Sequence, residues 1–418
     1  MHRVWITGRG VVSPLGSTPD ALADALEQQR SGVRLLPGAA ALGITPYTCV
    51  GASIGNDPGG ADVADPQWSA SLLALLDRNA MLGLRAAQAA WQDAGLAQAS
   101  LDPQRAALAW GCGMGGAATA EQSYADLFAP SPRRLHPYVV VRTMNNAAAA
   151  HIAMRHGLQG PLLSVSNACA SAAQAIGEGM HWVRSGRADL VVVGGSEALL
   201  VPGVIRAWQA MGVLARTDLQ QPEASCRPFD RRRNGLVLGE GAGALVLESE
   251  AHARARGARP LAELAGYGSS CDATHLSRPD EAGQVRAMRQ ALQDAGLQPA
   301  QVGHLNAHGT GTPVGDAVEA RSIHAVFGGD GPRPAVAATK ALHGHLMGAS
   351  GAVELIASLE ALRRGRLPPS AHVSDSDCLA WIDLIEGAVR SVPVEAVMSN
   401  SFAFGGANAS LVLRHAVA

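Results

Sequence analysis

The chain has 418 residues, of which 47% are apolar and 16% are charged, and its formal net charge is only −2. This length can bury one large core or two fused cores, and the apolar content excludes intrinsic disorder. The balanced charge provides no global field for a nucleic acid or a membrane surface, so any charged partner must meet a local patch.

The sequence predicts no membrane span, metal cluster or disulfide framework. Residues 1–5 lack the apolar region of a signal peptide, and the longest charge-free apolar run, residues 106–120, is too short to cross a bilayer. A soluble cytoplasmic protein is therefore expected. The cysteines form no CxxC pair and have no zinc-like spacing, which predicts free and mostly buried thiols. They are Cys49, Cys112, Cys169, Cys226, Cys271 and Cys378.

An internal repeat indicates how the chain is organised. The segment AWQDAGL at 90–96 returns as ALQDAGL at 291–297. Each copy is typical of an Ala-rich helix that ends at a Gly cap and is followed by a linker, a strand and a Gly-rich turn. Apolar runs at 190–193 and 243–247 predict strands buried on both faces. We expect a duplicated α/β unit whose two halves, 1–250 and 251–418, fuse into one body.

Cys169 follows a strand-like segment, and residues 170–185 predict a helix that ends at Gly186. The stripe expected to face inward consists of Ala173, Ile176, Met180 and Val183. At a helix start, free N–H groups and the macrodipole favour a thiolate, so the pattern predicts a lowered thiol pKa and donors for an oxyanion. A cysteine considered alone is more often a small buried hydrophobe, and only this context favours a nucleophile.

Two histidines occupy Gly-rich turns in the second half. His308 ends a strand-like run within 306–316, and His345 lies within 340–351, ahead of a predicted helix that ends at Gly365. The inward positions expected on that helix are Leu355, Ile356 and Leu359. Singly, each histidine is more often a core or turn residue than a catalyst. The Thr-Gly-Thr loop after His308 lacks P-loop and dinucleotide spacing, which excludes a nucleotide site.

Together these segments resemble the beta-ketoacyl synthases, most closely the elongating type that depends on acyl carrier protein. The motifs are NACASA around Cys169, HGTGT from His308, and Lys340 with Gly344-His345. Further similar segments, at 7–16, 227–230, 239–243 and 400–408, extend the resemblance over nearly the whole chain. The resemblance implies a thiolase-like five-layer αβαβα fold built from two duplicated halves, and it implies dimers.

The resemblance also implies a decarboxylating Claisen condensation. Cys169 would accept an acyl chain from a carrier-protein thioester, with the oxyanion held by backbone N–H groups of Cys169 and Phe404. His308 and His345 would then hydrogen-bond the thioester oxygen of malonyl carrier protein and stabilise the enolate left by CO2. Neutral imidazoles suit this role because they can donate to an enolate without protonating its carbon. No cofactor is required, since phosphopantetheine arrives on the carrier protein.

Supporting positions follow from the same resemblance. Lys340 would organise the histidines, with Asp316 and Glu319 as candidate partners, whereas His343 is a weaker candidate than His345. Thr310 and Thr312 match positions that bind phosphopantetheine. A structural Na⁺ or K⁺ site maps onto Asn306, Glu354, Ser399 and Asn400, although these residues could equally be ordinary turn and helix positions.

The chain departs from the family pattern near the acyl pocket and the dimer interface. Bulky Trp208 and Met114 stand where the acyl pocket is expected, which predicts a restricted or unusual acyl specificity. Ala403 replaces the usual glycine before Phe404 and should stiffen that loop. Residues 137–141 and 147–150 depart near the dimer interface. Besides a homodimer in fatty acid elongation, these changes suggest a specialised polyketide or polyene ketosynthase with a related partner subunit.

Two further readings concern the class of protein. A thiolase would need a second cysteine near the C-terminus, but no cysteine follows Cys378. A non-catalytic chain-length partner typically lacks the nucleophile, so Cys169 with both histidines favours an enzyme. Residues 231–233 form an Arg-Arg-Arg run that could meet an acidic carrier protein, although such a run is more often a solvated face.

Overall fold

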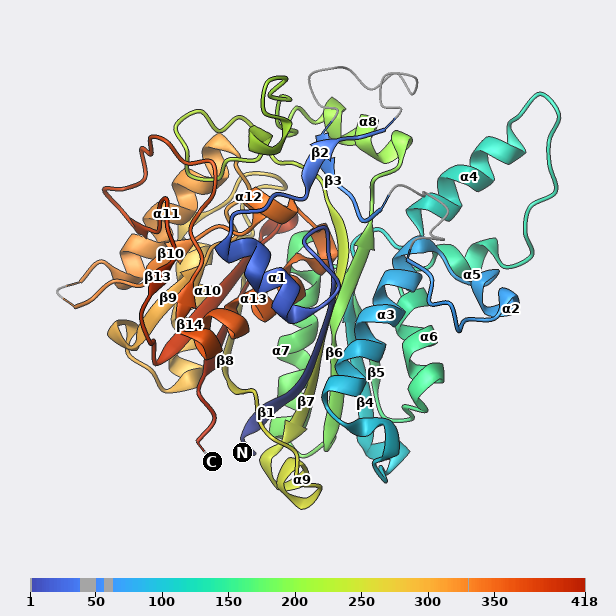
Figure 1. Ribbon diagram of the computed structural model, residues 1–418, viewed down its shortest axis with the longest axis horizontal. Helices are drawn as coiled ribbons and strands as arrows, with labels where there is room; N and C mark the ends of the chain where they lie inside the picture. The colour runs from blue at the N-terminus through green and yellow to red at the C-terminus, as the bar shows by residue number, and fades with distance from the viewer. Residues whose placement is uncertain (1, 38–49, 56–62, 330, 418) are drawn as a thin grey trace.

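The computed structural model describes residues 2–37, 50–55, 63–329 and 331–417. Within these residues, eleven strands form one continuous mixed sheet (Figure 1). In sheet order they are β12 (Asp383–Leu384), β10 (Ala335–Ala337), β9 (Val302–Asn306), β14 (Ala396–Phe402), β15 (Ala407–Arg414), β8 (Ala262–Cys271), β1 (Val4–Val12), β7 (Glu240–Ser249), β6 (Leu190–Ala198), β4 (Ala106–Gly111) and β5 (Leu162–Val165).

Helices cover the outer faces of the two halves of this sheet and also lie between their inner faces. They are α1 (Pro19–Glu27), α2 (Ala70–Leu73), α3 (Arg78–Asp93), α4 (Ala117–Leu127), α5 (Val139–Thr143), α6 (Ala147–His156), α7 (Ser171–Arg184), α8 (Pro202–Ala210), α9 (Glu250–Ala255), α10 (Glu281–Ala295), α11 (Pro313–Phe327), α12 (Lys340–His343) and α13 (Ser350–Arg364). Short strand pairs β2 (Val33–Leu35) with β3 (Val50–Ala52), and β11 (Arg366–Leu367) with β13 (Arg390–Ser391), lie outside the main sheet. None of the helices in the described part of the chain has the length and apolarity to cross a membrane.

The sheet consists of two halves joined by a narrow contact. Only Trp5 and Ile6 of β1 pair with β8, at Glu263 and Ala262. Helices α3 and α6 cover the outer side of the first half, α10 and α11 cover the outer side of the second, and α7 and α13 lie between them (Figure 1). The layers therefore run αβαβα, which confirms the predicted thiolase-like fold.

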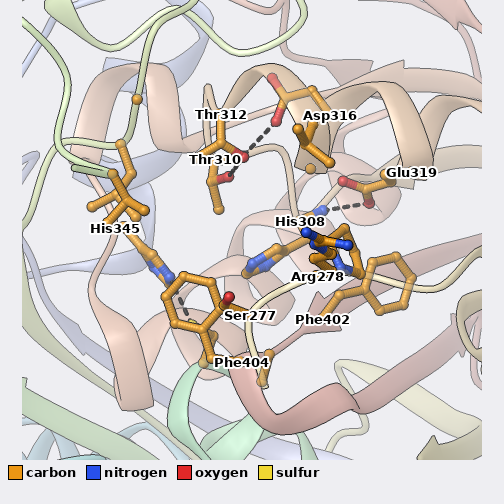
Figure 2. Close-up of a pocket in the computed structure, with 18 of the residues that line it drawn as sticks. Ser277, Arg278, His308, Thr310, Thr312, Asp316, Glu319, His345, Phe402 and Phe404 are labelled. Atoms are coloured by element: carbon orange, nitrogen blue, oxygen red, sulfur yellow. Dashed lines mark hydrogen bonds between the residues drawn. The ribbon is translucent and has the colours of Figure 1, made fainter. Parts of the chain in front are cut away.

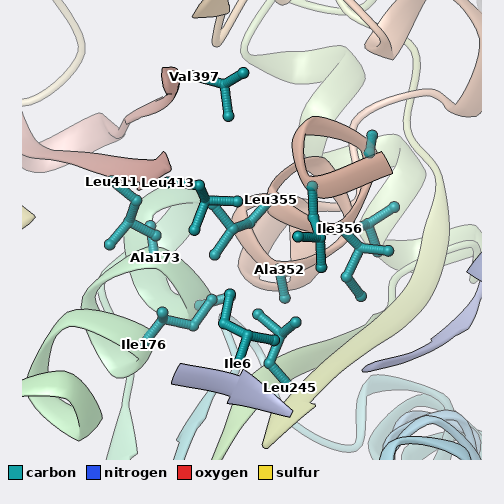
Figure 3. Close-up of a cluster of buried hydrophobic side chains, with 14 of the residues drawn as sticks. Ile6, Ala173, Ile176, Leu245, Ala352, Leu355, Ile356, Val397, Leu411 and Leu413 are labelled. Carbon is teal, nitrogen blue, oxygen red and sulfur yellow. The ribbon is translucent and has the colours of Figure 1, made fainter. Parts of the chain in front are cut away.

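The central layer is the largest core and also positions the site. Ile176 of α7 packs with Leu355 and Ile356 of α13 between the inner faces of the two half-sheets (Figure 3). A Cβ on Gly351 would come within 2.9 Å of Ala173, so glycine permits α13 to lie against α7 near the starts of both helices. All seven predicted inward positions on these helices are buried, as expected.

The predicted duplication is visible in matching units. Helices α3 and α10 both end just before a left-handed glycine, Gly95 at φ 67° and Gly296 at φ 65°, and each leads to a strand, β4 or β9. Each helix also packs closely on a glycine of a matching strand, α3 on Gly8 of β1 and α10 on Gly266 of β8. At either glycine an added Cβ would lie 2.3 Å from a backbone oxygen of the helix, so both close contacts require glycine. The predicted strands at 190–193 and 243–247 lie within β6 and β7. The boundary between residues 250 and 251 stays a prediction.

The described cysteines are free thiols, and all except Cys271 are buried. This confirms the prediction for five of the six cysteines, because Cys49 lies outside the described residues.

Candidate active site

Two matching bends bring Cys169 and His345 together. Cys169 lies in the 3₁₀ turn Ala168–Ala170 directly before α7, and His345 lies just before the 3₁₀ turn Met347–Ala349 that leads into α13. Ala168 and Met347 both have φ 46°, a left-handed conformation that is uncommon for residues other than glycine. Because α7 and α13 lie side by side, the bends aim the two side chains at each other. The Cys169 Sγ to His345 Nε2 distance is 3.0 Å.

His308 completes a buried triangle with these two residues. The Sγ of Cys169 and one ring nitrogen of each histidine all lie within 4.8 Å of one another. The rings of His308 and His345 meet edge to face with centroids 5.4 Å apart (Figure 2). A thiol with two imidazoles can hold a soft metal ion, or it can act as a nucleophile beside two hydrogen-bond donors.

The surroundings of His345 determine which ring nitrogen carries the proton. The backbone N–H of Met347 donates to His345 Nδ1 at 3.2 Å, and Ser350 Oγ lies 3.0 Å from the same nitrogen. In the neutral ring, Nε2 therefore bears the hydrogen and donates toward Cys169 Sγ. Burial, together with the charge of Lys340, holds the pKa of His345 well below its usual range, so the ring is neutral.

Lys340 orients His308 in a similar way. Its Nζ lies 3.4 Å from His308 Nδ1 and is paired with the carboxylate of Glu354, and both members of this ion pair are fully buried. Because an ammonium can only donate, His308 Nδ1 accepts and Nε2 carries the hydrogen. Burial and Lys340 also depress the pKa of His308. The site thus presents two neutral Nε2–H donors.

The expected partnership of Lys340 with Asp316 and Glu319 is wrong. Glu319 accepts from the backbone N–H groups of His308 and Gly309 at 2.7 and 2.8 Å. Asp316 accepts from the backbone of Phe229, Thr310 and Gly311 at 2.8, 3.1 and 3.1 Å. One turn apart on α11, these two carboxylates hold the His308 loop by its backbone, whereas Glu354 on α13 neutralises Lys340.

The lowered thiol pKa predicted for Cys169 is also wrong. Complete burial raises the pKa of Cys169 to about 12, which outweighs the opposing effects of Lys340 and of hydrogen bonds from the backbone N–H groups of Phe404 and Cys169. Desolvation is the stronger effect because only 4% of the Cys169 surface is exposed. The two N–H groups nevertheless lie where the resemblance places an oxyanion site.

A cavity of about 280 Å³ leads to Cys169 and is mostly apolar in lining. Thr310 and Thr312 line it with their hydroxyl oxygens 3.1 Å apart (Figure 2), and Leu276, Ser277 and Arg278 line it as well. These positions agree with the places expected for the two threonines. His343 is buried outside the cavity lining and contacts Thr339 Oγ1.

Of the two bulky residues expected in the acyl pocket, only Trp208 lines this cavity. It stacks on Phe404 with ring centroids 5.9 Å apart. Met114 lies outside the cavity, and its side chain is 49% exposed in the turn after β4. Ala403, at φ −116° and ψ 153°, has an ordinary extended backbone, so its effect on loop stiffness stays a prediction.

The expected cation residues do not all share one side of the sheet. Asn306 on β9 and Ser399 on β14 are register partners, so their side chains point to the same face, toward Glu354. The second oxygen of Glu354, Oε2, is buried without a hydrogen-bond partner. The side chain of Asn400 points to the other face, where it contacts Ser410 and Met288. Three of the four side chains therefore fit a cation beside Glu354.

The arginines of the 231–233 run each have an acidic partner. Arg231 pairs with Asp375, Arg232 with Asp230, and Arg233, which is buried, with Asp377. These pairs disfavour an unpaired basic patch for a carrier protein.

Sequence reasoning missed Ser350, which contacts His345, and Glu197, a buried carboxylate beside the site. A glutamate inside the otherwise apolar strand 190–198 was the available signal for Glu197.

Comparison with known proteins identifies the family of the chain that carries this triangle. Residues 1–253 match the N-terminal domain model of the beta-ketoacyl synthases, and residues 261–374 match the C-terminal domain model. The chain belongs to the beta-ketoacyl synthase family.

The similarity to individual members of the family covers nearly the full length of the chain. It is 36% identical to the 3-oxoacyl-[acyl-carrier-protein] synthase 2 of Coxiella burnetii, covering 99% of this chain and 98% of that protein. It is 39% identical to nodulation protein E of Rhizobium sp. strain N33, covering 99% of both chains. Similar solved structures include a beta-ketoacyl synthase from Burkholderia phymatum (TM-score 0.90, 33% identity) and the ishigamide ketosynthase/chain length factor (TM-score 0.89, 31% identity), each covering 100% of both chains.

Proposed function

We propose that the protein condenses a Cys169-bound acyl group with malonyl-acyl carrier protein, giving 3-oxoacyl-acyl carrier protein and CO2. The observation that carries this proposal is the meeting of Cys169 Sγ with two neutral Nε2–H donors at the inner end of one cavity. Fatty acid elongation is the primary assignment. No cofactor is needed beyond the phosphopantetheine that the carrier protein brings.

In the first half-reaction, the Cys169 sulfur attacks the thioester carbon of an acyl carrier protein. The bond from that carbon to the carrier sulfur breaks, and the carrier thiolate takes up the proton that Cys169 loses. His345 Nε2–H, at 3.0 Å from Sγ, stabilises negative charge on the sulfur. The backbone N–H groups of Cys169 and Phe404 can hold the oxyanion of the tetrahedral intermediate.

In the second half-reaction, malonyl carrier protein enters the same cavity. Its carboxylate leaves as CO2, and the electron pair of the broken C–C bond moves onto the thioester oxygen. His308 and His345 donate their Nε2 hydrogens to this oxygen and stabilise the enolate. The enolate carbon attacks the acyl carbonyl, the bond to Cys169 breaks, and the thiolate recovers a proton from solvent.

The assignment is tested by incubating the purified protein with acyl carrier protein, with and without malonyl carrier protein, and measuring intact masses. An acyl adduct should form on the protein in the first case, and a 3-oxoacyl carrier protein should form in the second. The absence of both species across short, long and unsaturated acyl chains would overturn the proposal.

Trp208 should restrict which acyl chains react. Its indole, stacked on Phe404 beside Cys169, fills space that a long saturated chain would need. We expect Trp208→Phe to increase acylation by long saturated chains about tenfold relative to short chains, since pocket volume changes of this size are worth a few kcal/mol. Mass-detected acylation rates for a matched chain series measure the ratio. Equal use of all chains by the unmodified protein would contradict the restriction.

A second ketosynthase-like subunit would cover the apolar edge of the first half. Strand β5 is an edge strand of the sheet and contacts α6, and α5, which also contacts α6, exposes Val141 and Val140, the latter 68% exposed. Exposed edges and apolar patches of this kind mark interfaces. We expect dimers in light scattering and monomers after Val140→Asp with Val141→Asp. A monomeric parent protein would indicate a heterologous partner instead, which is the arrangement expected for a specialised polyketide or polyene ketosynthase.

Two smaller expectations belong to the same proposal. A structural Na⁺ or K⁺ beside Glu354 would satisfy its unpartnered oxygen, with Asn306 and Ser399 nearby. The protein would work in the cytoplasm, where carrier-protein substrates are made.

A further inference from the structure

Glu197, at the end of β6, lies between the two halves of the active site. It is completely buried, and its Oε2 accepts the backbone N–H of Gly113 at 2.7 Å and that of Gly348 at 3.1 Å. Gly113 belongs to the turn after β4 in the first half, and Gly348 belongs to the turn after His345 in the second. One carboxylate oxygen therefore joins the two turns.

The space around this carboxylate has no room for a side chain at either neighbouring glycine. A Cβ on Gly113 would lie 2.5 Å from Glu197 Oε2, and a Cβ on Gly348 would lie 2.7 Å from it. The other oxygen, Oε1, accepts the N–H of Met114 at 3.3 Å and lies 3.8 Å from Cys112 Sγ. Two glycines and three backbone donors are thus fitted to one side chain.

We propose that Glu197 is a positioning residue that holds the His345 turn against the turn after β4, beside Cys169. The inference rests on the proposed ketosynthase function, because it assigns a role to Cys169 as the acyl acceptor. Loss of Glu197 should loosen the His345 turn and make the free thiol more reactive toward simple electrophiles.

Charges of opposite sign act on Cys169. Lys340 favours the thiolate, whereas Glu197 raises the pKa of Cys169, and the neighbouring His308 and His345 are neutral. The titratable side chains that interact with Glu197 are Cys112 and Cys169, and burial raises its own pKa to about 7. Near pH 8 the carboxylate is therefore mostly ionised, and its removal should favour the thiolate.

Glu248 offers a matched control on the neighbouring strand. It is also a fully buried glutamate, but its partners are Thr7, His252 and Arg256. It pairs with Leu190 on β6, seven residues from Glu197, which corresponds to roughly 23 Å along a strand. Glu248→Gln should destabilise the fold without changing the electrostatics of Cys169.

The experiment follows alkylation of Cys169 by iodoacetamide from pH 6 to 10, read from the mass of the Cys169 peptide, beside condensation kinetics. For Glu197→Gln we expect alkylation to be about tenfold faster between pH 8 and 10, because a fall of about one unit in a thiol pKa that lies above this range raises the thiolate fraction about tenfold. The kcat of condensation should fall about tenfold with little change in KM. Glu248→Gln should leave both unchanged.

Glu197→Asp separates charge from position and also serves if Glu197→Gln does not fold. It should lower kcat, because its carboxylate cannot reach both turns, while the alkylation rate between pH 8 and 10 stays near that of the parent protein. An unchanged alkylation profile in Glu197→Gln, or full condensation activity in Glu197→Asp, would overturn the inference. Alkylation needs no carrier protein. The alkylation assay therefore tests the role of Glu197 even if the parent protein forms no 3-oxo product.

Discussion

Replacing Cys169 with alanine should abolish the acyl adduct and lower the rate of condensation at least about 10³-fold, which corresponds to about 4 kcal/mol of transition-state stabilisation. The Cys169 sulfur lies 3.0 Å from His345 Nε2, and alanine leaves the two imidazole donors without a group to acylate. Intact-mass measurement of the adduct and timed assays of the 3-oxo product provide the test.

Cys271→Ala is the control for this prediction. Cys271 is the exposed member of the described cysteines and thus the one most open to adventitious acylation. Its variant should keep both the adduct and the product. An adduct that survives in Cys169→Ala and disappears in Cys271→Ala would show that the buried triangle is not the acylation site.

Replacing Glu354 with glutamine should destabilise the protein by about 3 to 5 kcal/mol, the usual cost of removing one partner from a buried ion pair. Lys340 and Glu354 are both fully buried, so Glu354→Gln would leave a buried ammonium without the carboxylate that neutralises it and holds it in place. Lys340 would then no longer fix the tautomer of His308, and condensation should fall at least about tenfold. Denaturant unfolding and the condensation assay measure the two effects.

The double variant Lys340→Met with Glu354→Leu separates stability from activity. Apolar residues of similar volume often replace a buried ion pair without loss of stability, so most of the unfolding free energy should return. Activity should remain low because His308 Nδ1 still lacks its donor. If the double variant condensed at the parental rate, or if Glu354→Gln were as stable as the parent protein, the ion pair would have no role in the site.

Much of the architecture could be predicted from local sequence patterns. The repeated AWQDAGL and ALQDAGL segments predicted a duplicated helix–strand unit, and α3–β4 and α10–β9 are that unit. The inward stripe of α7 was visible because helical periodicity depends only on neighbours along the chain. The reactive triangle followed from motifs, since each of its members lies next to a glycine-rich turn or a helix start.

Electrostatic partners and pKa values were not predictable in the same way. The family resemblance suggested Asp316 and Glu319 as partners of Lys340, yet their carboxylates lie against the backbone of the His308 loop. The thiol pKa depends on desolvation from all sides, which overrides the helix-start effect that the sequence suggested. Met114 similarly lies outside the cavity because the path of its turn depends on Glu197.

The sequence by itself predicted the fold class, Cys169 and the two histidines, because helix starts, glycine turns, repeats and the motifs that carry the family resemblance are properties of short segments. Only the tertiary structure decided that Glu354 neutralises Lys340, that burial raises the pKa of Cys169, and that Glu197 joins the His345 turn to the turn after β4. Each of these depends on groups from distant segments that meet in a buried space. There the loss of water strengthens charge interactions and hydrogen bonds and raises the cost of leaving a polar group unpaired.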